Sequence, residues 1–265
     1  VRTIFAQTIN GKRQLWIGTY GGLHLWDESN NSFKHWGALS GKTNSLSHNF
    51  IRTIISDHRN RLWIGTYGGG LNLFDPETDS WKHYKGNPSI QNSISGNEIM
   101  TIALDPDTAH PHLWIGTDGN GISLMDIQQE TFKSISISEG LPSDAIYNII
   151  PSGRDHFWIA TNNGLSQLRY IPDNQFAFRN FNTVDGLPSN IFAQGSYHLT
   201  HDGVLYFGGV HGVVSVNTNT LVFNQIPGKP HITGYTIHDG ESTVERNVFG
   251  LKELSIGSSI TWLTF

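Results

Sequence analysis

The hydrophobic and polar positions of this chain follow a pattern that occurs five times. Each copy begins with an apolar run, such as IRTIISD from Ile51 or IMTIALD from Ile99. A polar turn follows, then a run centred on an aromatic residue, a glycine turn, an alternating run such as GLNLFD, and an aromatic-rich run such as WKHY. Short alternating segments bounded by Gly, Asn and Asp predict β-strands. The pattern therefore predicts four antiparallel strands in each copy and very little helix.

The aromatic residue at the centre of the second strand gives the period of the repeat. Its five occurrences are separated by 47, 51, 44 and 48 residues and are Trp16, Trp63, Trp114, Trp158 and Tyr206. This period, with four strands per copy, is typical of the blades of a β-propeller. We therefore predict an all-β propeller of four-stranded antiparallel blades, with repeat units at about 1–45, 46–93, 94–140, 141–186 and 187–228. The first strand of each blade should line the central channel, and the fourth should face solvent.

A second motif connects the copies and reads NSLSHNFI from Asn44 and DGLPSNIF from Asp185. We expect its apolar residue to plug the space between blades, and its later Asn or Asp to bond nearby backbone N–H groups. Val1 aligns with Ile51, so no connector precedes the first unit, whereas the fifth unit has all four predicted strands, the last at 221–226. We expect these blades to belong to a seven-bladed ring, in which a further blade would cover the apolar side of the first.

The pattern changes after residue 228. The runs HITGYTIHDGE, ELSIGSS and SITWLTF predict strands of another β domain. Residues 229–265 number only 37, which is too few to bury an adequate core alone. We therefore expect this segment to be the truncated beginning of an Ig-like β-sandwich.

The repeat LWIGTYGGGL, the connector NSLSHNFI and the trailing segment PHITGYTIHDG resemble the two-component regulator propeller family. The resemblance covers nearly the whole chain. It implies the periplasmic sensor region of a hybrid histidine kinase of Bacteroides-type bacteria, with propellers of about seven blades before a tyrosine-rich Ig-like module. It also implies that this chain is not itself an enzyme. The longer inner-membrane protein would be a sensor histidine kinase that detects an oligosaccharide or a related nutrient and controls transcription.

The partners expected from this resemblance are an oligosaccharide or other small nutrient, bound directly or through a ligand-binding protein, and the kinase region, reached through the Ig-like module. We also expect a homodimer of the full-length protein. A formal charge of −5 argues against contact with nucleic acid, which requires a basic face. No run of 18 apolar residues is present, and the absence of Cys excludes disulfides, thiolate metal sites and cysteine nucleophiles.

The glycine turns and the aromatic series both have structural interpretations. A phosphate cradle needs a helix after its glycines, but here an alternating strand follows. We predict that the glycines supply positive φ angles and close packing between the second and third strands; they are Gly21, Gly69, Gly121 and Gly164. We predict that the aromatic series packs between blades instead of stacking on a sugar.

Candidate ligand residues are those that vary inside the constant frame of the second-to-third strand turns, which open on the same face as the connectors. They are Tyr20, Tyr67, Asp118, Asn120, Asn162, Asn163 and His211. Aromatic, amide and carboxylate groups suit sugar recognition by stacking and hydrogen bonding. Turn chemistry explains the Asn and Asp residues equally well.

Two alternatives to a sensor stay open, namely a propeller enzyme of the lyase or glycosidase type and a protein-interaction scaffold. Most acidic residues lie in turns at repeated positions instead of forming the carboxylate pair of a glycosidase. The pairs His110–His112 and His198–His201 are interpreted as histidines of the first-to-second strand turns, although propeller lyases use His and a divalent metal. We therefore expect no catalytic residue, no metal site and no cofactor.

Overall fold

The computed structural model describes residues 1–9, 11–28, 31–90, 92–106, 111–171, 175–219, 234–238, 243–247 and 262–264. The chain divides into two compact units, Val1–Thr220 and Leu221–Phe265. The sequence places the corresponding boundary after residue 228, inside a stretch that lies outside the described residues.

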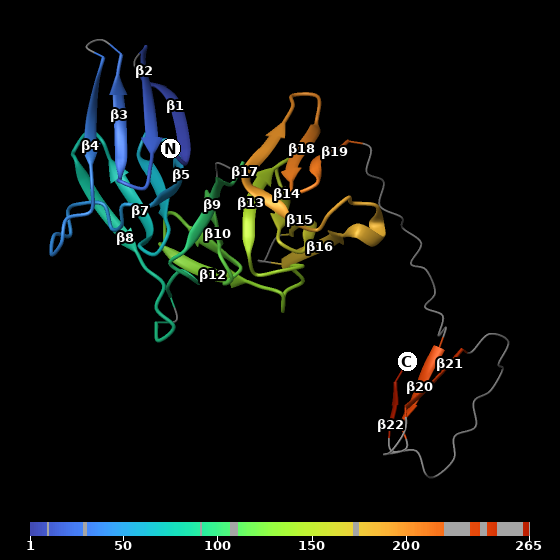
Figure 1. Ribbon diagram of the computed structural model, residues 1–265. Coiled ribbons are helices and arrows are strands. Elements are labelled where there is room, and N and C mark those ends of the chain that lie inside the picture. Colours follow the sequence, from blue (N-terminus) through green and yellow to red (C-terminus); the bar gives the residue numbers. More distant parts are fainter. Residues whose placement is uncertain are drawn as a thin grey trace. The chain divides into compact units, whose positions relative to one another are not determined.

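The first unit is built from antiparallel sheets whose strands are paired in chain order (Figure 1). The first blade contains β1 (Thr3–Ile9), β2 (Lys12–Gly18), β3 (Leu23–Asp27) and β4 (Ser32–Trp36). The second contains β5 (Ile51–Ser56), β6 (Leu62–Thr66), β7 (Gly70–Asp75) and β8 (Ser80–Tyr84). The third contains β9 (Ile99–Leu104), β10 (His112–Thr117), β11 (Ile122–Asp126) and β12 (Thr131–Ile135). The fourth contains β13 (Ile146–Pro151), β14 (His156–Thr161), β15 (Gly164–Ile171) and β16 (Gln175–Phe181).

The fifth blade has three described strands, β17 (Phe192–Leu199), β18 (Val204–Gly209) and β19 (Gly212–Asn217). Its predicted outer strand at 221–226 lies outside the described residues. The predicted fold class, a β-propeller of antiparallel blades, is confirmed. In the described part of the chain the helical content is the short 3-10 helix Thr183–Asp185, and no helix there has the length and apolarity to cross a membrane. The seven-bladed ring stays a prediction.

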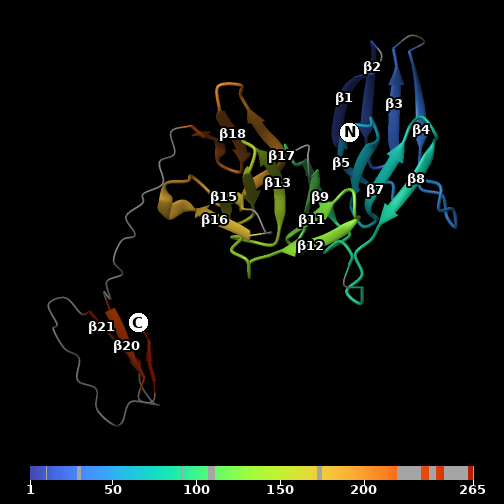
Figure 2. The ribbon, with the colours of Figure 1, turned by 180° about the vertical axis from the view of Figure 1, so that it is seen from behind.

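The first strands of the blades lie nearest the axis. Strands β1, β5, β9, β13 and β17 contact one another in that order, and β17 also contacts β9. Figures 1 and 2, which show opposite sides, both place β17 beside β13 and β9. Residues of distant blades can therefore meet at the axis.

The apolar core lies between neighbouring blades. Trp16 packs with Leu62, Ile64 and Phe74 of the second blade. At the next two interfaces, Trp63 packs with Leu113, Ile115 and Met125, and Trp114 packs with Phe157, Ile159 and Leu168. Trp158 lies against Phe207 of the fifth blade, with 6.4 Å between ring centroids. These four indoles are at most 1% exposed, so they have no free face for a sugar, whereas Tyr206 is 38% exposed.

One glycine of each turn has a positive φ and stands at the first residue of the third strand or directly before it. Its φ is 125° at Gly22, 76° at Gly70, 70° at Gly121 and 102° at Gly164. A Cβ at these positions would lie 2.2–2.4 Å from the carbonyl oxygen that ends the fourth strand. The prediction of positive φ was therefore wrong by one residue for Gly21 and Gly69. Gly69 is restricted differently, because a Cβ there would lie 2.5 Å from the Cβ of His48 in the connector.

The connectors fix the spacing between blades. Their apolar residues Leu46, Ile94 and Leu141 are at most 4% exposed, whereas Leu187 is half-buried. The side-chain oxygen of the following Asn or Asp accepts a backbone N–H bond from the segment after the fourth strand. Asn49 accepts from Ala38 at 2.6 Å, Asn97 from Gly86 at 2.8 Å, Asp144 from Ile137 at 3.0 Å and Asn190 from Thr183 at 2.9 Å.

In the second unit, β20 (Gly234–His238), β21 (Thr243–Asn247) and β22 (Trp262–Thr264) form an antiparallel sheet in the order β21-β20-β22. The predicted Ig-like module stays a prediction.

Candidate functional site

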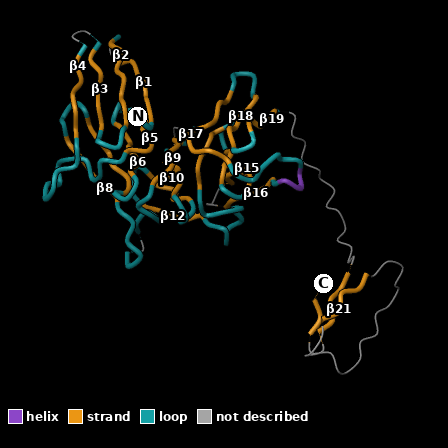
Figure 3. Tube along the Cα trace, viewed as in Figure 1, coloured by secondary structure: helices purple, strands orange, loops and turns teal. Residues whose placement is uncertain are grey.

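The variable turns and the connectors meet at one end of the blades, where they form the loop-rich face of the propeller (Figure 3). The N–H of Tyr67 donates to the carbonyl of Phe50 at 2.9 Å, and that of Asp118 donates to the carbonyl of Glu98 at 3.0 Å. In the fourth blade, the N–H of Gly164 donates to the carbonyl of Asn190 at 2.7 Å. The turns of the second and third blades are thus tied to the connectors that precede those blades, and the turn of the fourth blade is tied to the connector that follows it.

Three aromatic side chains form a continuous strip on this face. The rings of Tyr20 and Phe50 have centroids 4.1 Å apart, and those of Phe50 and Tyr67 are 5.5 Å apart. Tyr20 is 61% exposed, and the other two are half-buried. The hydroxyl of Tyr67 donates to Oδ2 of Asp118 at 3.4 Å, which connects the strip to the third blade. The strip crosses the turns and connectors of the first two blades.

A guanidinium group lies against this strip. Cζ of Arg52 is 4.5 Å from the ring centroid of Phe50 and 4.8 Å from that of Tyr67. Arg2 holds the equivalent place in the first blade, with its Cζ 5.9 Å from the ring centroid of Tyr20. Burial, and then the neighbouring charge of Arg2, lower the pKa of Arg52, while Tyr20, Tyr67 and Asp118 act in the opposite direction. An Arg side chain stays cationic under such conditions, so two like charges lie close together here.

A bulge in β17 of the fifth blade brings the side chain of Gln194 next to Arg2 and Arg52. The pairing of β17 with β18 shifts register between Phe192 and Tyr197, and Gly195 has a φ of 70°. Asn148, which is 1% exposed, donates to the carbonyl of Ala193 at 2.9 Å and accepts from the N–H of Gly195 at 2.7 Å. The peptide groups on both sides of Gln194 are therefore held by one buried side chain.

Gln194 joins the fifth blade to three other blades at the axis. Its Oε1 accepts a hydrogen bond from Nη1 of Arg52 at 2.6 Å, and it lies 3.5 Å from Nη2 of Arg2. Its Nε2 donates to the carbonyl of Met100 at 2.5 Å. We call this group of side chains the axial cluster and define it as Arg2, Tyr20, Phe50, Arg52, Tyr67, Asp118 and Gln194.

The sequence identified three members of the axial cluster, Tyr20, Tyr67 and Asp118. Phe50, Gln194 and the two arginines were missed, although Arg2 and Arg52 stand at a position where the third and fourth blades have Met100 and Tyr147. The four other candidates have no contact with the cluster among the described interactions. Asn163 donates to the carbonyl of Pro142 at 2.9 Å, Asn120 lies against Gly96 of a connector, and Asn162 and His211 are exposed in their turns.

The histidine pairs lie partly outside the turns in which they were predicted. His112 is the first residue of β10 and His198 lies within β17, while His110 is outside the described residues. Nδ1 of His112 lies 3.6 Å from Oδ2 of Asp105. Among the residues that the structure describes, no three His, Asp or Glu side chains gather to hold a metal ion.

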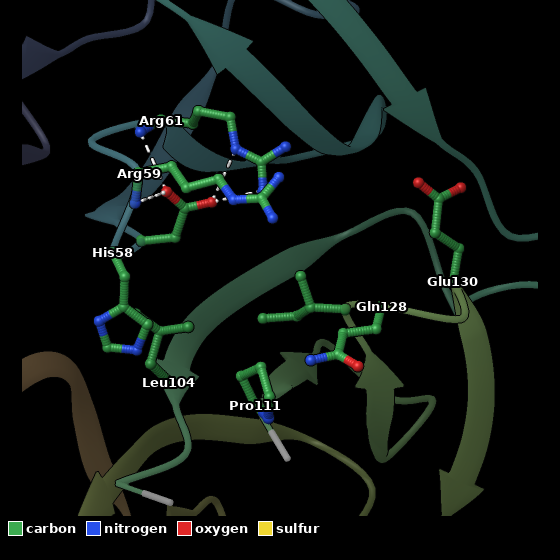
Figure 4. Close-up of a pocket in the computed structure, with 9 residues that line it drawn as sticks. His58, Arg59, Arg61, Leu104, Pro111, Gln128 and Glu130 are labelled. Carbon is green, nitrogen blue, oxygen red and sulfur yellow. Dashed lines mark hydrogen bonds and ion pairs between the residues drawn. The ribbon is translucent and has the colours of Figure 1, made fainter. Parts of the chain in front are cut away.

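A pocket of about 470 Å³ lies at the opposite end of the second and third blades (Figure 4). It is lined by Asp57, His58, Arg59, Arg61, Leu104, Pro111, Ile127, Gln128 and Glu130. Asp57 is paired with Arg61 at 2.7 Å, and Glu130 is paired with Lys82 of β8 at 2.5 Å. The hydrogen bond from Lys82 is the main cause of the lowered pKa of Glu130. Both carboxylates of this pocket are already ion-paired with basic side chains of the protein. The axial cluster is therefore the stronger candidate site.

Comparison with known proteins supports the family resemblance that the repeat pattern indicates. Residues 45–68 match the family model described as two component regulator propeller. Histidine kinase P4 of Formosa agariphila is 26% identical over 227 residues, which cover 84% of this chain and 16% of that protein. The resemblance to the two-component regulator propeller family is therefore confirmed.

Solved structures share the fold. The extracellular domain of one hybrid two component system of B. thetaiotaomicron has a TM-score of 0.70 and 24% identity, with coverage of 84% of this chain and 29% of that chain. A second such domain from the same organism has a TM-score of 0.63 and 25% identity, with coverage of 83% and 30%. Virginiamycin B lyase from Staphylococcus aureus, at 0.54 and 13% identity, is similar in fold alone. The chain spans less than a third of the kinase and of the two extracellular domains.

Proposed function

We propose that this chain is the ligand-sensing propeller in the extracytoplasmic region of a hybrid two-component histidine kinase. It responds to an oligosaccharide or a related nutrient in the periplasm. Ligand occupancy passes through the C-terminal unit and across the membrane to a kinase region that controls transcription, in a protein that acts as a homodimer. The chain itself binds and does not catalyse.

The observation that carries this proposal is the alignment of 227 residues with a histidine kinase, together with the propeller-family match at residues 45–68. The family match covers a connector together with strands β5 and β6. Two solved extracellular domains of hybrid two-component systems share the fold over more than four fifths of this chain. These similarities support an extracytoplasmic sensor over a scaffold of unrelated use.

The axial cluster supports sugar as the ligand class. Sugar rings bind on exposed aromatic faces, and their hydroxyl groups need donors and acceptors around the rim. The strip of Tyr20, Phe50 and Tyr67 offers ring surface, of which Tyr20 is 61% exposed. Arg52, Asp118 and Gln194 surround it with a cation, a carboxylate and an amide. Such a set can orient a small polar ligand without reacting with it.

The test is calorimetric titration of the full chain with a panel of neutral, carboxylated and sulfated oligosaccharides. We expect one class to bind, and Tyr67→Ala to weaken that binding about tenfold or more because it interrupts the aromatic strip. Phe33→Ala is the matched control, since Phe33 is 60% exposed on the outer strand β4 and lies outside the cluster. Melting curves of all variants should stay close to that of the unmodified chain.

Two results would contradict the proposal. Absence of binding across the whole panel would remove the sugar-sensing role. Release of cleaved products from any panel member would show a propeller enzyme in its place.

A further inference from the structure

We propose that the ligand of the axial cluster carries an oxyanion, a carboxylate or a sulfate on a sugar ring, and that Arg52 and Arg2 bind this group where Oε1 of Gln194 now stands. The inference rests on the proposed sensing function and adds the chemical class of the ligand. Three features of the cluster lead to it.

The first feature is positive charge without a paired carboxylate. Within the described part of the chain, no ion pair joins Arg2 or Arg52 to an Asp or Glu, whereas Arg61, Lys82 and Arg169 all have such partners. Nε of Arg52 is buried and has no hydrogen-bond partner there. A half-buried guanidinium beside a second cation carries a cost that an anion would relieve. Neither arginine of the cluster is therefore ion-paired with the group that arginine binds best, a planar or tetrahedral oxyanion.

The second feature is the position of Gln194. Its Oε1 lies 2.6 Å from Nη1 of Arg52 and 3.5 Å from Nη2 of Arg2, so one oxygen faces both guanidinium groups. A neutral amide oxygen makes a weaker bond to arginine than a charged oxygen does. Because Asn148 holds the backbone on both sides, the Gln194 side chain can leave without loss of the bulge. The amide oxygen thus marks the position that a ligand oxyanion would take.

The third feature is the direction of the charges across the aromatic strip. Asp118 is the carboxylate whose charge acts on Arg52, and it accepts a bond from Tyr67 on the third-blade side. The exposed ring of Tyr20 lies on the other side, next to Arg2. A sugar ring on Tyr20 and Phe50 would therefore direct a substituent toward the two arginines and away from Asp118. A carboxylate or sulfate fits this position, whereas a neutral hydroxyl gives neither arginine an ion-pair partner.

The experiment compares matched ligands by calorimetry on the full chain. Galacturonic acid oligosaccharides are titrated beside galactose oligosaccharides of the same length and beside sulfated galactose oligosaccharides. We expect at least one acidic series to bind about tenfold more tightly than the neutral one, with affinity falling between about 50 and 500 mM salt. The two acidic series distinguish a carboxylate from a sulfate.

Variants of Arg52 and Gln194 identify the residues that bind the acidic group. Arg52→Gln should abolish the preference for the acidic series, while Arg59→Gln, at an exposed turn in the opposite pocket, should leave it unchanged. Gln194→Glu places a carboxylate of the protein beside Arg52 and should weaken acidic ligands about tenfold. Gln194→Ala, which removes the competing oxygen, should keep the preference. If Arg52→Gln does not fold, Gln194→Glu provides the same test with the arginine in place.

Equal affinity for acidic and neutral series, or an acidic preference that persists in both Arg52→Gln and Gln194→Glu, would overturn the oxyanion inference and leave the sensing function intact. Absence of binding by every series would overturn both. The two failures are therefore distinguishable.

Discussion

At the scale of single residues, the turn between the second and third strands depends on one glycine with a fixed backbone geometry. Gly121 combines a φ of 70° with a position where a Cβ would lie 2.2 Å from the carbonyl oxygen of Ile135. Its neighbour Gly119 also has a positive φ, 94°, but has open space around it. Substitutions at these two glycines of one turn therefore separate the effect of backbone strain from the effect of a steric clash.

We predict that Gly121→Ala lowers the free energy of unfolding by about 2 kcal/mol or more, because strain and a backbone clash add. Gly119→Ala should cost about 1 kcal/mol, since only the positive φ opposes it. Denaturant titration of both variants measures the difference. Equal losses would show that the clash at Gly121 is relieved by a small movement of the fourth strand.

We expect a histidine pair to make the stability of the first blade depend on pH. The rings of His24 and His35 have centroids 4.6 Å apart. Burial, and then the charge of His35, lower the pKa of His24 below its ordinary value of 6.5. The unfolded chain therefore binds more protons than the folded chain near that pH, so stability rises with pH. The contribution is present above pH 6.5 and is lost as the pH falls through the lowered pKa of the folded state.

We predict that the melting temperature of the unmodified chain falls between pH 7.5 and pH 5.5, and that His24→Gln falls less over this range. Melting curves at closely spaced pH values measure the effect. His58→Gln, in an exposed turn of the second blade, should keep the pH dependence of the unmodified chain. A His24→Gln variant with unchanged pH dependence would mean that other groups govern this range.

At the scale of elements, most strands follow from the alternation of the sequence. The runs LWIGT and GLNLFD coincide with β6 (Leu62–Thr66) and β7 (Gly70–Asp75). Hydrophobic periodicity determines such strands locally, and this explains why the pattern was sufficient. The bulge of β17 is different, since its shape depends on Asn148 in the neighbouring blade. No local signal in FAQGSYHL indicates that Gln194 would reach the axis.

The candidate site was partly predictable for the same reason. Tyr20, Tyr67 and Asp118 lie at corresponding turn positions, so their common face follows from the repeat. Arg52 and Gln194 are 142 residues apart and meet only because the inner strands surround one axis. Contacts across the axis depend on how the blades close, which a period alone does not specify.

We predict that Asn148→Ala destabilises the chain by about 1–3 kcal/mol, because two backbone groups of the bulge lose their buried partner. The same variant should disturb ligand affinity, since the support of Gln194 is lost. Asn163→Ala removes one exposed side-chain bond, to Pro142, and should stay within about 0.5 kcal/mol of the unmodified chain. Denaturant titration and calorimetry measure both effects. An unchanged stability for Asn148→Ala would show that the bulge holds itself in place.

At the scale of the whole first unit, we expect stability to depend mainly on the interfaces between blades. Three apolar clusters in the described part of the chain each join one blade to the next. Such an array behaves as units coupled to their nearest neighbours, so one weakened interface can separate the unfolding of the blades on its two sides. The aromatic position of the second strand allows this to be tested, because the same position is buried in four blades and partly exposed in the fifth.

We predict that Trp114→Ala costs about 3–5 kcal/mol, because its fully buried indole packs against Phe157 and Ile159 of the next blade. Tyr206→Ala, at the corresponding position with 38% exposure, should cost less than half as much. Hydrogen exchange should show the first three blades and the fourth opening at different free energies in Trp114→Ala. In Tyr206→Ala, and in the unmodified chain, we expect the same blades to open together. If Trp114→Ala lowers the protection of every blade equally, the blades form one cooperative unit, and the nearest-neighbour description does not apply to this propeller.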